Sequence, residues 1–130
     1  MGRVLIIEDD RFNRRLYKDL LEAEGLDVLL ACSADEGLTL ARETLPDLVV
    51  MDIEMPGMSG LEATRQLKAD ERTRAVPVLV ISAHAMIEHE ANAHDAGCAG
   101  FLRKPLEFPG FQEVVMRLVA EGKRPAAVSG

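Results

Sequence analysis

The sequence has little cysteine, no excess of basic charge and no long hydrophobic run, and each shortage excludes a class of protein. Its two cysteines, Cys32 and Cys98, are far apart and form no CxxC pair, so we expect buried thiols rather than a disulfide or metal site. The net charge of −7 argues against a nucleic-acid binder, because such a domain gathers lysine and arginine on one face. The first apolar run, Val4–Ile7, is too short for a signal peptide or membrane span. We therefore expect a cytoplasmic protein.

The remaining composition is that of an ordinary globular domain. The chain has 130 residues, of which 48% are hydrophobic and 28% are charged. We expect one domain over residues 1–122 and a short flexible tail over residues 123–130. The tail is too short and polar for an output domain, so we expect none to be attached.

Short apolar runs predict the strands of this domain. They are rich in valine, isoleucine and leucine and nearly continuous, which is typical of strands covered on both faces. The four clear runs and a weaker fifth are Val4–Ile7, Val28–Ala31, Leu48–Met51, Val78–Ile81 and Gly100–Leu102.

Helical patterns lie between these runs. Apolar residues recur at helical spacing from Asn13 to Glu24 and again from Phe111 to about Gly122. Ser33 and Ser59 are each followed three residues later by glutamate, as in a capping box, and Met86–Ala96 is rich in helix formers. Strand and helix thus alternate five times, which predicts a doubly wound α/β fold: a parallel sheet with helices on both faces.

Polar residues follow the predicted strands, at the edge where such sheets bind ligands. Glu8 and Asp9 follow the first strand, Asp52 the third and Ser82 the fourth, and Lys104 comes shortly after the fifth. Two carboxylates about 4 Å apart repel by about 4 kcal/mol at an effective dielectric near 20, so a cluster of carboxylates favours a bound cation. Oxygen ligands of this kind suit Mg²⁺.

With a metal beside it, Asp52 is a plausible nucleophile for phosphoryl transfer. Lys104 would share the charge of the phosphoryl group, and Ser82 could donate a hydrogen bond to it only in the phosphorylated state. Asp10, the third acid after the first strand, is better interpreted as a helix cap or surface residue than as a metal ligand. Each residue alone is more often structural, but their joint placement favours function.

These motifs resemble the response-regulator receiver domains of two-component signalling, from about Arg3 to Val119. The resemblance is carried by Glu8-Asp9, by Asp52 within the run Val49–Gly60, by Ser82 and by Lys104-Pro105. It implies a flavodoxin-like five-stranded sheet in the order 2-1-3-4-5. It also implies that Asp52 accepts a phosphoryl group, that Ser82 and Lys104 contact it, and that Mg²⁺ is bound by Glu8, Asp9, Asp52 and the backbone carbonyl of Glu54.

The resemblance implies further roles around the site. Phe101 stands where the family has an aromatic residue that turns inward with Ser82, although a plain core role is equally consistent with its position. Glu54 and His84 stand over the path of attacking water and would tune hydrolysis, while His84 can also be read as a surface residue that titrates near neutral pH. We expect slow autodephosphorylation as the only turnover, so the chain is not an enzyme in the usual sense.

The implied partners are proteins. A histidine kinase or histidine phosphotransferase would donate the phosphoryl group and meet the first helix. A downstream target would bind the face formed by the fourth helix, fifth strand and fifth helix, with the chain as a monomer or a phosphorylation-dependent dimer. The sequence is also similar to the DivK-type regulators of bacterial cell-cycle and polarity signalling. The segments that carry this similarity are Glu8–Asp10 with Asn13, Leu20–Gly25 and Gly97-Cys98.

Several alternatives stay open. The chain could be a receiver module excised from a hybrid kinase or diguanylate cyclase, or an interaction module of the same fold that works without phosphorylation. A flavin-binding electron carrier would need a phosphate-binding loop where Glu8–Asp10 stand, and those carboxylates repel phosphate. A hydrolase with an aspartyl intermediate would need a cap insertion for which the chain has no room.

Overall fold

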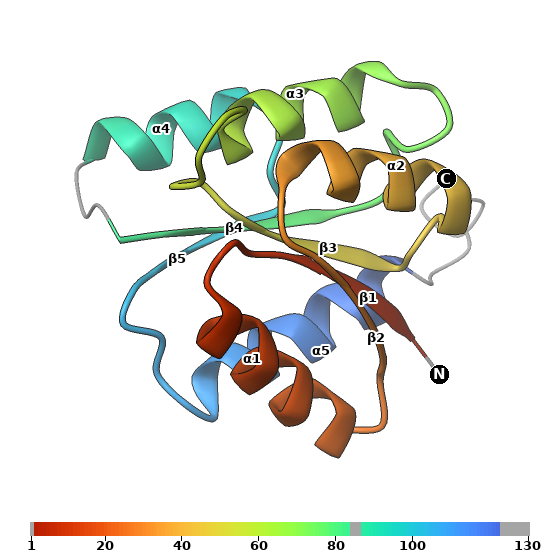
Figure 1. Cartoon of the computed structure of the whole chain (residues 1–130), viewed down its shortest axis with the longest axis vertical. Coiled ribbons are helices and arrows are strands. Elements are labelled where there is room, and N and C mark those ends of the chain that lie inside the picture. The colour runs from red at the N-terminus through yellow and green to blue at the C-terminus, as the bar shows by residue number, and fades with distance from the viewer. Residues whose placement is uncertain (1, 84–86, 123–130) are drawn as a thin grey trace.

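The computed structural model describes residues 2–83 and 87–122, which form a five-stranded parallel sheet between two layers of helices (Figure 1). The strand order is β2-β1-β3-β4-β5, so the predicted fold class and strand order are confirmed. The elements in chain order are β1 (Arg3–Ile7), α1 (Arg11–Ala23), β2 (Asp27–Ala31), α2 (Ala34–Thr44), β3 (Leu48–Asp52), α3 (Gly60–Ala69), β4 (Val78–Ser82), α4 (Ile87–Asp95), β5 (Gly100–Arg103) and α5 (Gly110–Gly122).

Alternation along the strands divides the core into two layers. Val4 and Ile6 of β1 pack with α1 and α5, whereas Leu5 and Ile7 pack with the layer of α2, α3 and α4. All residues of β3 and β4 are buried, as their continuous apolar runs predict. The edge strands β2 and β5 are mostly half-buried, because each has a neighbouring strand on one side only.

Side-chain caps fix the starts of three helices. Asp10 accepts a hydrogen bond from the Asn13 N–H and caps α1, as expected, but the helix begins at Arg11, two residues earlier than the apolar pattern predicts. Ser33 and Ser59 cap α2 and α3. The two capping boxes differ from prediction: the Glu36 carboxylate accepts from Cys32 N–H rather than from Ser33, and Glu62 forms an ion pair with Arg65.

A glycine brings α3 against the end of β3. An added Cβ on Gly60 would lie 2.3 Å from the backbone carbonyl oxygen of Asp52, so only glycine allows this approach. The Thr64 hydroxyl, one turn later, donates to the Gly60 carbonyl at 2.7 Å. The first turn of α3 is therefore packed directly on the backbone of Asp52.

The expectation of two buried thiols is wrong for Cys32. Cys32 is exposed because it follows the edge strand β2, and Cys98 is half-buried; both are free. No helix in residues 2–83 and 87–122 is long and apolar enough to cross a membrane. Three expectations fall outside the described residues: the tail at 123–130, the helix start at Met86 and His84.

Candidate functional site

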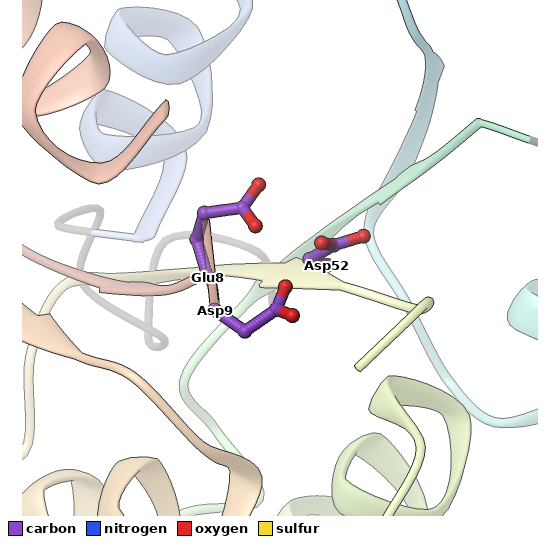
Figure 2. A group of neighbouring side chains, drawn as sticks. All are labelled: Glu8, Asp9 and Asp52. Carbon is purple, nitrogen blue, oxygen red and sulfur yellow. The ribbon is translucent and has the colours of Figure 1, made fainter. Parts of the chain in front are cut away.

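Three carboxylates meet at the carboxyl edge of the sheet. One oxygen each from Glu8, Asp9 and Asp52 lies within 4.8 Å of the others, at the ends of the neighbouring strands β1 and β3 (Figure 2). Glu8 and Asp52 are only 2% and 3% exposed, whereas Asp9 is open to solvent. The predicted convergence of these acids is therefore present in the folded chain.

Lys104 joins two of the three acids. Its Nζ lies 3.1 Å from Glu8 Oε1 and 3.2 Å from Asp52 Oδ2. The Lys104 N–H donates to the carbonyl of Ser82 at 2.8 Å, which continues the pairing of β5 with β4 past the end of the strands. The ammonium group of Lys104, which follows the edge strand β5, is thus held between the carboxylates at the ends of β1 and β3.

The buried acids differ in their protonation. Burial, together with the hydrogen bond and negative charge of Glu8, raises the pKa of Asp52 to about 7, against the opposing effect of Lys104. Burial also acts to raise the pKa of Glu8, but hydrogen bonds from the Asp10 N–H and with Asp52, together with Lys104, lower it overall. Without a metal, and below about pH 7, the pair therefore holds a proton on Asp52.

The other two charged groups follow the same electrostatics. Partial burial and the neighbouring Glu8 raise the pKa of Asp9. Burial alone would lower the pKa of Lys104, but the charges of Asp52 and Glu8 raise it, so the ammonium form is favoured. Three carboxylates with one ammonium leave an excess of negative charge, and their hard oxygen atoms are the ligands that Mg²⁺ prefers. The donor set fits a divalent cation.

Arg14 orders the acidic loop and was not anticipated from the sequence. Its Nη1 donates to the backbone carbonyls of Glu8 and Asp9, both at 2.9 Å. Side chains of a helix point toward its N-terminus, so an arginine in the first turn of α1 can reach back to the preceding loop. The sequence could have indicated this contact only if the start of α1 had been placed at Arg11, because Arg14 then falls in the first turn of the helix.

Ser82 and Glu54 are joined by a hydrogen bond that the sequence did not reveal. The Ser82 hydroxyl donates to Glu54 Oε2 at 2.7 Å, and the Ala83 N–H donates to Glu54 Oε1 at 2.7 Å. The Glu54 N–H in turn donates to Asp52 Oδ1 at 3.2 Å. Glu54 therefore connects the carboxylate of Asp52 with the end of β4.

Phe101 lies in β5, half-buried against the core layer that contains α3 and α4. It also lines a groove of about 460 Å³ between α4, β5 and α5, together with Glu90, Phe111 and Val114. His84, which together with Glu54 was expected to tune hydrolysis of the phosphorylated state, falls outside the described residues.

Comparison with known proteins identifies the family. The sequence-family model described as the response regulator receiver domain matches residues 4–116 of this chain. The chain belongs to the response-regulator receiver family. This receiver is 43% identical over 112 residues to the polar-differentiation response regulator DivK of Brucella ovis, covering 86% of this chain and 91% of that protein. The resemblance to DivK-type regulators is thereby confirmed.

Solved structures agree with this assignment. The signal receiver domain of a signal transduction histidine kinase from Syntrophus aciditrophicus superposes with a TM-score of 0.89 at 27% identity, over 96% of this receiver and 95% of that chain. The receiver domain of a sensor histidine kinase from Pseudomonas aeruginosa gives a TM-score of 0.84 at 27% identity, over 92% and 98%. That structure has a magnesium ion coordinated in its active-site cleft.

Proposed function

We propose that the protein is a phosphorylation-activated switch in which Asp52 accepts a phosphoryl group from a histidine kinase or histidine phosphotransferase. The observation that supports this most strongly is the position of Lys104 Nζ, within 3.2 Å of both Asp52 and Glu8, beside a third carboxylate. A buried aspartate in contact with a fixed cation has the surroundings that an anionic transfer reaction requires.

The chemistry of the step follows from these groups. One carboxylate oxygen of ionised Asp52 forms a bond to phosphorus while the bond between phosphorus and the donor's imidazole nitrogen breaks. Lys104 stays as an ammonium group and balances charge on the phosphoryl oxygens. Glu8, Asp9, Asp52 and the backbone carbonyl of Glu54 would hold Mg²⁺, which when bound would neutralise further phosphoryl charge. Beyond accepting and slowly losing this group, we expect no turnover.

The output of the switch is protein binding. Ser82, at the end of β4, would turn its hydroxyl toward the phosphoryl group, and Phe101 in the neighbouring strand β5 would follow. Phe101 lines the groove between α4, β5 and α5, and this groove suits a downstream protein target. The names of the DivK relatives suggest a role in cell polarity. A cytoplasmic location stays a prediction.

The test is phosphorylation by a small donor. We expect incubation with acetyl phosphate and Mg²⁺ to add the mass of one phosphoryl group to the wild-type protein and none to Asp52→Ala. Backbone NMR shifts should spread from Asp52 to Ser82 and Phe101 when beryllium fluoride is added as a phosphoryl mimic. Asp19→Asn is the matched control, because Asp19 is exposed on α1 in an ion pair with Arg15 and should leave phosphorylation intact.

A different result would reassign the chain. If the wild-type protein gains no mass and shows no Mg²⁺-dependent shifts near Asp9 and Asp52, the phosphorylation proposal is wrong. The chain would then be an interaction module with the receiver fold that acts without phosphorylation.

A further inference from the structure

The Glu54 carboxylate accepts hydrogen bonds from two donors at the end of β4. Its two oxygens each accept at 2.7 Å, one from the Ser82 hydroxyl and one from the Ala83 N–H. Glu54 and Ser82 are 28 residues apart, and the carboxylate crosses from the loop after β3 to the end of β4. Hydrogen bonds to an ionised acceptor are among the stronger ones in proteins.

The backbone of Glu54 is tied to the same site. Its N–H donates to Asp52 Oδ1 at 3.2 Å, and the preceding residue, Ile53, donates its N–H to the Ile81 carbonyl at 3.0 Å. These two bonds fix the loop beside β4, so the glutamate side chain is directed at Ser82 and Ala83. A carboxylate on this loop is therefore a neighbour both of Asp52 and of the donors on β4.

Donor counting makes the contact exclusive. A serine hydroxyl has one O–H to donate, and a backbone amide has one N–H. Neither donor can be given in full to Glu54 and to a phosphoryl oxygen at the same time. The planar carboxylate, with two acceptor oxygens, therefore accepts from the Ser82 hydroxyl, the donor that the proposed function assigns to a phosphoryl group on Asp52, and from the neighbouring Ala83 N–H.

We propose that the Glu54 carboxylate is an internal competitor of the phosphoryl group for the Ser82 hydroxyl and the Ala83 N–H. This inference rests on the proposed function, because it assumes that an anion is attached to Asp52. In the unphosphorylated protein Glu54 holds Ser82 in its resting position. On phosphorylation Glu54 has to release both donors, so its hydrogen bonds set how far the switch responds.

The experiment measures the affinity for beryllium fluoride in the presence of Mg²⁺, by titration followed with backbone NMR. Removing the competitor with Glu54→Ala should raise the affinity about tenfold, the size expected for losing a charge-assisted contact. Glu107→Gln is the control, because it removes the same charge from an exposed residue in the loop after β5 and should change the affinity little.

A second variant separates competition from simple charge repulsion. Combined with Ser82→Ala, the gain from Glu54→Ala should shrink, because one of the two contested donors is gone. A carboxylate that only repels the incoming anion would give the same gain in both backgrounds, and that result would overturn the proposal. No gain in either background would overturn it as well.

A further readout needs neither Mg²⁺ nor the mimic. The Ala83 amide proton should move upfield in Glu54→Ala, since it loses a 2.7 Å bond to a carboxylate; an unchanged signal contradicts the resting contact. Failure of the proposed function can be told apart from failure of the competition proposal alone. If the proposed function is wrong, the wild-type protein and Glu54→Ala both fail to bind beryllium fluoride. Competition is then overturned too, since there is no anion to compete with.

Discussion

At the scale of single residues, the site is defined by what surrounds Asp52. Burial and the negative charge of Glu8 raise the pKa of Asp52, whereas the positive charge of Lys104 lowers it, and the net effect favours a protonated Asp52. The sequence predicted Asp52, Glu8, Asp9, Ser82 and Lys104 because each follows a strand of one sheet. It could not reveal the Glu54 contact, because a glutamate in a loop carries no pattern that names a partner 28 residues away.

The raised pKa of Asp52 predicts a pH-dependent effect of Asp52→Asn on stability. In the metal-free wild type, Asp52 is protonated up to about pH 7 when folded, but only up to its ordinary value of 3.8 when unfolded. Stability contributed by this proton is therefore lost as the pH rises toward 7. The variant has no such loss, so its advantage in the free energy of unfolding should grow by at least about 1 kcal/mol between about pH 5 and pH 8.

Urea unfolding in the presence of a chelator measures this difference. Asp19→Asn, on the exposed face of α1, should show a difference from wild type that does not change with pH. A constant difference for Asp52→Asn as well would mean that the folded protein does not hold Asp52 protonated.

At the scale of elements, helix starts position the site. Asp10 caps α1 and so fixes the turn that carries Glu8 and Asp9. Asp10→Ala should therefore cost about 1 kcal/mol of stability, while Asp10→Ser keeps a capping oxygen and should cost little. Mg²⁺ affinity should be nearly the same in Asp10→Ser as in the wild type, as judged by titration. A large loss of affinity in the serine variant would make Asp10 a metal ligand instead of a cap.

The contact of α3 with β3 gives a second prediction at this scale. Gly60→Ala would press a methyl group against the Asp52 carbonyl, and overpacking of this kind costs about 1–3 kcal/mol. Gly110, also the first residue of its helix, has open space at the same position, so Gly110→Ala should be neutral or slightly stabilising. Thermal unfolding of the two variants tests this, and equal melting temperatures would contradict the close approach.

At the scale of the whole molecule, we expect metal binding and folding to be linked through the charge of the sheet edge. A cation that binds only the folded chain stabilises it, and its carboxylate ligands must first lose their protons. Because the pKa values of Asp52 and Asp9 are raised, Mg²⁺ should increase the melting temperature more at about pH 8 than at about pH 5.5. Calorimetry with and without Mg²⁺ measures this, with Asp52→Asn as the variant in which the pH dependence should weaken. An equal Mg²⁺ effect at both pH values would contradict the linkage.

The sequence by itself determined the order of strands and helices, the doubly wound class and the family. Apolar periodicity and strand-end motifs are local, and a parallel α/β arrangement brings all strand ends to one edge. The tertiary structure alone decided which atoms meet there: Lys104 between Glu8 and Asp52, Arg14 on the acidic loop, and Glu54 on Ser82 and Ala83. It also decided the exposure of Cys32 beside an edge strand. These features depend on distances between segments remote in the chain, which only the packed sheet defines.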